Sequence, residues 1–138
     1  GFMAGPKLNT YYATKNYLTK LVQNLSEIGL KEQEPVIINK KGIRFLFFSL
    51  SLLPERYHPE CIIYQNNIEE VFRQIKQYKK SDDFIVVSIH WGNEFATYPY
   101  NKQVKLAHRF IDEGVNLILG HHSHTYQGIE QYKGALIL

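Results

Sequence analysis

The chain has 138 residues, of which 44% are hydrophobic and 21% charged, and a formal net charge of +3. This composition is typical of one globular domain and excludes a disordered chain. The charge is mild and forms no long basic block, which argues against a nucleic-acid-binding protein. Cys61 is the single cysteine, so the chain can form neither an internal disulfide nor a thiolate metal cluster. No apolar run approaches the roughly 18 residues of a membrane span, and no signal peptide is recognisable.

The amino-terminal part predicts a helix followed by a β-hairpin. Apolar residues recur at helical spacing over Thr14–Ile28, which predicts an amphipathic helix. Two segments rich in β-branched and aromatic residues, Pro35–Asn39 and Ile43–Leu50, are predicted strands joined by a tight turn. The stretch Leu52–Gln65 has no clear period. We expect it to be a loop at a strand end, a position that often carries function.

A second amphipathic helix is predicted after this loop. Asn66 or Asn67 can cap its amino end. Its apolar stripe consists of Ile68, Val71, Phe72 and Ile75. The lysines near its carboxyl end suit the helix dipole, so we interpret them as a solvated face and not as a binding patch.

The carboxyl-terminal part predicts a βαβ unit over residues 84–120. Two apolar segments, Phe84–Ile89 and Val115–Leu119, flank a predicted helix over Asn101–Glu113. Strands joined in this way run parallel, and their carboxyl ends meet at one edge of the sheet. Open α/β sheets place their ligands at this edge. Gly128–Leu138 predicts a closing hairpin.

Histidines follow both predicted strand ends. His90 follows the first strand, and His121, His122 and His124 follow the second. Several imidazoles that converge from rigid strand ends can hold a divalent metal such as zinc, iron or manganese without cysteine. A single histidine in such a place is usually structural. Four histidines at one edge favour a metal site, although a role as hydrogen-bonded strand caps stays open. His108 lies in the predicted helix between the two strands and is expected at the surface.

Other side chains near these histidines have alternative interpretations. Glu94 could be a metal ligand, could orient His90 or could act as a general base. Gly92 and Gly120 allow sharp backbone turns and the close approach of a ligand. We expect Trp91 to pack over the strand end. Some tyrosines could line a substrate groove, although a chain with 10 tyrosines exposes several by chance: Tyr57, Tyr98, Tyr100 and Tyr126.

The order and spacing of these motifs resemble the bacterial capsule-synthesis CapA family, which includes PgsA-like proteins of poly-γ-glutamate biosynthesis. The resemblance is specific over Phe84 to Leu138 and weaker over Tyr11 to Leu50. It rests on His90-Trp91-Gly92-x-Glu94, Gln103, Leu106-Ala107-His108, Ile111-Asp112-x-Gly114, Gly120-His121-His122-x-His124 and Gln127-Gly128-Ile129-Glu130.

The resemblance implies an α/β fold of the calcineurin-like metallophosphoesterase type, a layered α/β/β/α sandwich. Residues 1–138 would then be one partial domain, the carboxyl-terminal part of a longer one. In that superfamily a strand-end histidine and a later Gly-His-x-His pair bind metal. This implies metal ligation by His90, His122 and His124, with His121 as an alternative to His122, and catalytic roles for His90, Glu94 and His122.

The family's amino-terminal metal-binding motifs have no counterpart here, since no Asp precedes Asp82 and no Asn is followed by His. A two-metal clamp about 3.5–4 Å across therefore cannot be assembled from this chain alone. A partner chain could supply the missing ligands.

The resemblance also implies a function in the synthesis of a capsule or poly-γ-glutamate-type polymer at the cell envelope. The cofactor would be a divalent metal (Mn, Fe or Zn), and a hydrolytic member would use a metal-activated water to attack a phosphoester. The alternative is a non-catalytic accessory subunit that binds an acidic polymer, a glycan or a polymer-synthesis partner at the same crevice. The full-length protein could carry a membrane anchor; no nucleic acid is expected as a partner.

Overall fold

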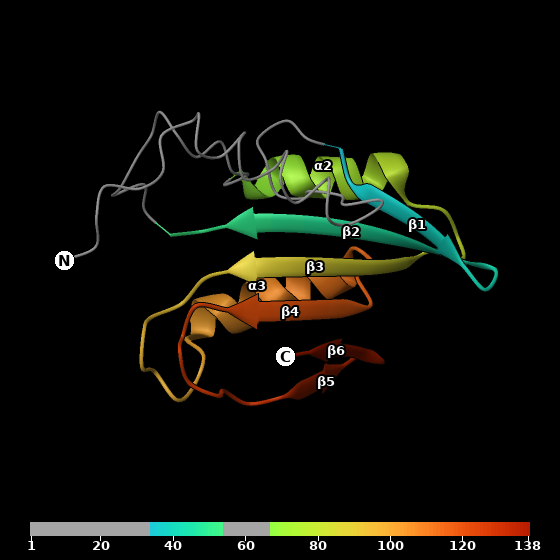
Figure 1. The fold of residues 1–138 in the computed structure, drawn as a ribbon. Coiled ribbons are helices and arrows are strands. Elements are labelled where there is room, and N and C mark those ends of the chain that lie inside the picture. The colour runs from blue at the N-terminus through green and yellow to red at the C-terminus, as the bar shows by residue number, and fades with distance from the viewer. Residues whose placement is uncertain (1–33, 54–66) are drawn as a thin grey trace, which may run out of the picture.

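The computed structural model describes residues 34–53 and 67–138 (Figure 1). The predicted helix over Thr14–Ile28 and most of the predicted loop over Leu52–Gln65 lie outside these residues.

Within the described part of the chain, six strands form a single mixed sheet in the order β1-β2-β3-β4-β6-β5 (Figure 1). The four central strands β2, β3, β4 and β6 run parallel to one another. At the two edges of the sheet, β1 pairs antiparallel with β2, and β5 pairs antiparallel with β6. The fold class is therefore α/β, as predicted. The strands are β1 (Val36–Lys40), β2 (Ile43–Ser51), β3 (Phe84–His90), β4 (Leu117–His121), β5 (Glu130–Tyr132) and β6 (Ala135–Ile137).

Both predicted hairpins are confirmed. β1 and β2 pair antiparallel through a turn at Lys41 and Gly42, where both residues have positive φ. The closing hairpin pairs β5 with β6, and Gly134 in its turn has φ +86°. β6 also pairs with β4, so this hairpin extends the main sheet.

The two strands of the predicted βαβ unit, β3 and β4, pair parallel as expected, with α3 (Asn101–Asp112) between them. The prediction for β4 was wrong at its ends, because the strand begins at Leu117 and continues to His121. The amide of Val115 bonds to the carbonyl of Phe110 at the end of α3, so that residue belongs to the helix terminus and not to the ladder. This shift makes His121 the last residue of the strand.

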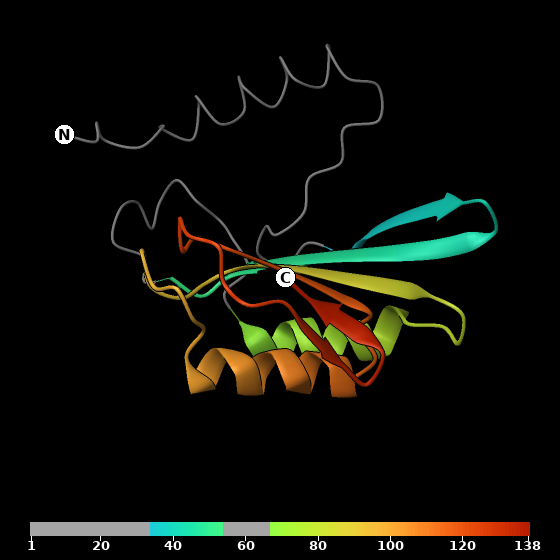
Figure 2. The ribbon, with the colours of Figure 1, turned by 90° about the horizontal axis from the view of Figure 1, so that it is seen from below.

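Helices α2 (Ile68–Tyr78) and α3 lie on the same face of the sheet (Figure 2). Asn67 caps α2, because its Oδ1 accepts hydrogen bonds from the amides of Glu69 and Glu70. The core between helices and sheet includes Leu46, Phe48, Leu50, Val71, Phe72, Ile75, Ile85, Val87, Ile89, Phe110 and Ile118. Among the described residues, neither helix is long and apolar enough to cross a membrane.

The opposite face of the sheet carries the side chains that alternate with this core. On β3 these are Phe84, Val86, Ser88 and His90, one residue out of step with Ile85, Val87 and Ile89. Leu119 on β4 and Leu136 on β6 are more than a third exposed. This face therefore combines apolar residues along the strands with histidines at their carboxyl ends.

Candidate functional site

The carboxyl ends of the three central strands bring the predicted site residues together. Ser51, His90 and His121 are aligned across β2, β3 and β4, since Ser51 pairs with His90 and His90 pairs with His121. The arrowheads of these strands lie at the same edge of the sheet in Figure 1. Two segments leave this edge, residues 91–100 and residues 122–129, and they carry the remaining candidates.

The four predicted histidines lie close together at this edge. The ring centroid of His90 is 5.0 Å from that of His121 and 4.7 Å from that of His122. His124 follows, with its ring 5.7 Å from the ring of His122. The prediction that these side chains meet at one edge of the sheet is therefore confirmed.

Glu94 joins two of these histidines in a compact group. Ligand atoms of Glu94, His122 and His124 all lie within 4.8 Å of one another. The closest approach between Glu94 and His124 is 3.9 Å, from Oε1 to Nε2. His122 is half-buried, whereas Glu94 and His124 are exposed.

Two serines contact the histidines from neighbouring strands. Ser51 Oγ lies 3.3 Å from His90 Nδ1, and Ser88 Oγ lies 3.2 Å from His121 Nε2. When Nδ1–H of His90 donates to Ser51, Nε2 keeps its lone pair for a ligand, as in many metal-binding histidines. His121, by contrast, uses its Nε2 on Ser88. Among the described residues, His122 and not His121 groups with Glu94 and His124, so the geometry favours His122 as the partner of His124.

Hydrogen bonds lock the two loops to each other. The amide of Phe95 donates to the carbonyl of Ser123 over 2.7 Å, and the amide of Trp91 donates to that of His121 over 3.1 Å. Thr125 Oγ1 and Gln127 Nε2 both donate to the carbonyl of Ala96, over 2.7 and 2.9 Å. The position of Glu94 relative to the histidines is therefore set by backbone contacts on either side of it.

The backbone at the site adopts conformations that L residues rarely take. His122 has φ +104° and His124 has φ +56°. Such conformations cost of order 1–3 kcal/mol each and persist where the surroundings enforce them. They are concentrated at functional sites, which supports a role for these two side chains beyond packing.

The electrostatics of the site favour neutral imidazoles. Burial lowers the pKa of His90 below its usual range, and His121, His122 and His124 lower it further. Burial also lowers the pKa of His121, with a further contribution from His122. A neutral imidazole is the form that binds a metal or accepts a proton.

The donor set fits a divalent cation. Two imidazoles and one carboxylate are ligands that zinc, iron and manganese accept. In a tetrahedral site with metal–ligand bonds near 2.1 Å, the donor atoms lie about 3.4 Å apart. The 4.8 Å spread of Glu94, His122 and His124 is wider than this, so side-chain rotations would have to draw the group together.

Trp91 and Gly120 have a structural role. Trp91 is only 8% exposed and packs into the core, as predicted. A Cβ on Gly120 would lie 2.8 Å from Trp91 Nε1 and 3.0 Å from the carbonyl oxygen of Leu138. Gly120 therefore makes room for the indole and has no positive φ, whereas Gly92 does form a sharp turn as expected, with φ +86°.

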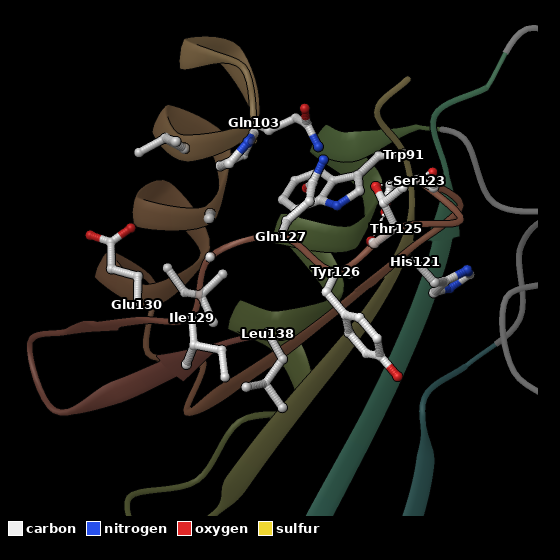
Figure 3. Close-up of a pocket in the computed structure, with 16 residues that line it drawn as sticks. Trp91, Gln103, His121, Ser123, Thr125, Tyr126, Gln127, Ile129, Glu130 and Leu138 are labelled. Atoms are coloured by element: carbon white, nitrogen blue, oxygen red, sulfur yellow. Dashed lines mark hydrogen bonds between the residues drawn. The ribbon is translucent and has the colours of Figure 1, made fainter. Parts of the chain in front are cut away.

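A cavity of about 560 Å³ lies beside the site, between α3 and residues 120–130 (Figure 3). His121 and Ser123 connect it to the histidine edge, and Trp91 is among the residues that line it. Its glutamines are engaged in structural hydrogen bonds: Gln103 accepts from the amide of Tyr100, and Gln127 donates to Ala96. We therefore place the chemistry at the histidines and not in this cavity.

Sequence reasoning missed several contacts of the site. Ser51 lies between the predicted strand Ile43–Leu50 and the predicted loop Leu52–Gln65, and the sequence patterns identify neither Ser51 nor Ser88 as a histidine partner. A parallel alignment of β2 with β3 would have revealed both. His108 is partly exposed, as expected of a surface or rim histidine, but its stacking on Tyr132 at 3.8 Å and the 2.7 Å contact of its Nε2 with Glu130 were not foreseen.

The fold and the side-chain geometry define an α/β protein with a cluster of histidines at the carboxyl edge of parallel strands. A family model described as bacterial capsule synthesis protein PGA_cap matches residues 24–138, and the chain belongs to this family.

Curated relatives agree with this assignment. The chain is 41% identical over 63 residues to the PGA biosynthesis protein CapA of Bacillus subtilis (strain 168), a match that covers 46% of this chain and 17% of the relative. It is 39% identical over 59 residues to the capsule biosynthesis protein CapA of Bacillus anthracis, a match that covers 43% of this chain and 14% of the relative. It is 37% identical over 70 residues to a probable polyglutamine synthesis accessory protein of Mycobacterium tuberculosis (strain CDC 1551 / Oshkosh), a match that covers 51% of this chain and 18% of the relative. The matched part thus spans less than a fifth of each relative.

Proposed function

We propose that the protein acts in the synthesis of a capsule or poly-γ-glutamate-type polymer at the bacterial cell envelope, with a divalent-metal site at the histidine edge. Its family membership and the names of its relatives support the biological process. The observation that carries the metal site is the group of Glu94, His122 and His124, with His90 directly beside it.

Each side chain has a role in this proposal. His122 and His124 hold the metal, and His90 presents a neutral Nε2 that is oriented by Ser51. Glu94 either completes the ligand set or accepts a proton from the attacking water. A bound metal would lower the pKa of that water and neutralise charge on a phosphoester oxygen. His121 is left out of the proposed ligand set because the ligand atoms that lie within 4.8 Å of one another belong to Glu94, His122 and His124.

The proposal includes the layered α/β/β/α sandwich of the metallophosphoesterases. Both described helices cover one face of the sheet, and the other face leaves Leu119 and Leu136 more than a third exposed. A second apolar layer on that face would bury these side chains and stand next to the histidine edge. Carboxylate ligands for a second metal would come from that layer or from a partner chain, since no Asp precedes Asp82.

Elemental mass spectrometry tests the metal site directly. The protein is dialysed against metal-free buffer, and metal content is compared among wild type, the double variant His122→Ala/His124→Ala, and His108→Ala. His108 serves as the control because its ring lies against Tyr132 and not at the histidine edge. Near-stoichiometric metal in wild type and His108→Ala, with loss in the double variant, is expected. Equal metal in all three proteins, or none in wild type, contradicts the site.

A second candidate function is a non-catalytic accessory role, in which the same crevice binds an acidic polymer. The exposure of His124 and the net charge of +3 favour this role, because an open imidazole on a mildly positive protein suits an extended anionic chain. Binding of poly-γ-glutamate that persists in EDTA, together with no turnover of a phosphodiester, would favour the accessory role. Phosphodiester turnover that is lost in His124→Ala would favour the enzyme.

A further inference from the structure

Phe95, at the edge of the site, has two properties that are unfavourable for the free energy of folding. Its ring is 71% exposed, although burial is the usual environment of phenylalanine. Its backbone has φ +62°, in the left-handed region that favours glycine and is uncommon for bulky residues. Neither property stabilises the folded chain.

The backbone of Phe95 is fixed by the histidine segment. Its amide donates to the carbonyl of Ser123 over 2.7 Å, between His122 and His124. The ring centroid of Phe95 lies 6.0 Å from that of His124, with the planes tilted by 31°. The adjacent residue is Glu94, which belongs to the candidate metal group. An exposed apolar ring is therefore held at a defined place beside polar, ligand-binding side chains.

We propose that Phe95 is a specificity-determining residue, whose ring packs against the apolar face of a ring-shaped group attached to the phosphate of the substrate. This inference rests on the proposed metal site. Aromatic and sugar rings present apolar faces that stack on phenylalanine, whereas the phosphate oxygens would face His122 and His124. The substrate class is therefore a sugar or aryl phosphoester and not a small alkyl one.

Substitution of Phe95 by glycine separates this role from a packing role. The variant Phe95→Gly removes the ring and relieves the left-handed backbone, so its melting temperature rises if the ring contributes nothing to the fold. Lys41→Gly is the matched control, because Lys41 has φ +51° in the β1–β2 turn at the other end of β2. The control relieves similar backbone strain without touching the histidine edge.

The probes are phenylphosphonate and methylphosphonate, which keep the anionic head and differ in the apolar group. Their binding to the Mn²⁺-loaded protein is measured by isothermal titration calorimetry, with metal content determined in parallel. We expect Phe95→Gly to bind phenylphosphonate about tenfold more weakly than wild type and methylphosphonate equally well. Lys41→Gly should match wild type for both probes.

The possible results separate a failure of the proposed metal site from a failure of the proposed role of Phe95. Wild type that binds no metal contradicts the metal site, and the specificity role falls with it. Normal metal content with equal affinity of wild type and Phe95→Gly for phenylphosphonate overturns the role of Phe95 alone. A lower melting temperature of Phe95→Gly would assign the ring to packing and also overturn it.

Discussion

At the scale of single residues, Gly120 shows how tightly the strand end is packed. A Cβ at this position would contact Trp91 Nε1 at 2.8 Å and the backbone oxygen of Leu138 at 3.0 Å. We expect Gly120→Ala to lower the free energy of unfolding by about 1–3 kcal/mol, since overpacking displaces a buried ring and a strand. Urea denaturation measures this effect. Gly128→Ala is the control, because nothing lies within 4 Å of its added Cβ; equal midpoints for both variants would show that the indole moves freely.

His90 links the stability of the metal-free protein to pH. Its pKa in the folded state is lowered, first by burial and then by its histidine neighbours, whereas the unfolded value is about 6.5. Between these values the unfolded chain binds more protons, so stability is present above about pH 6.5 and is lost as the pH falls through the folded pKa. Urea midpoints measured in EDTA should decrease as the pH is lowered from 8 to 5. The decrease should be less steep in His90→Gln than in wild type. An NMR titration that places the pKa of His90 above 6.5 would reverse the sign.

At the scale of elements, the β5–β6 hairpin depends on α3. Its strands have three residues each, and Tyr132 stacks on His108 of α3 with ring planes only 5° apart. We expect Tyr132→Ala to accelerate amide hydrogen exchange at Leu136 and Leu138 by about 5- to 10-fold, because such a stack contributes about 0.5–1.5 kcal/mol. These amides donate to Asn116 and Ile118.

The control for this measurement is Gln131→Ala, which changes an exposed side chain of the same strand. Exchange at the buried Val87 of β3 reports on the rest of the sheet. Equal acceleration at Val87 would mean that the hairpin unfolds only with the whole sheet, and that Tyr132 has no local role.

The elements themselves were largely predictable, because their signals are local. The β-branched and aromatic residues of β1 and β2, the helical spacing in α2 and the Asn67 cap all lie within short windows of sequence. The start of β4 was misplaced because Val115 is apolar in either assignment, and the choice depends on its bond to Phe110 at the end of α3.

At the scale of the whole molecule, the convergence of the histidines was predictable, whereas their surroundings were not. Parallel strands joined by a helix bring their carboxyl ends together, which is a rule of topology. The contact of Ser51 with His90 depends on the register between β2 and β3. No local pattern encodes that register, and the same holds for the insertion of β6 between β4 and β5.

The alignment of His90 with His121 has a consequence for the time course of folding. The two residues are neighbours across β3 and β4, although all of α3 separates them along the chain. Contacts of this kind form slowly, because the entropy of loop closure opposes them until the crossover has docked. A newly synthesised chain therefore passes through a period in which its imidazoles are far apart. Glu94 precedes α3 and His122 and His124 follow β4, so the assembly of these three side chains into one group would mark the moment at which that crossover closes.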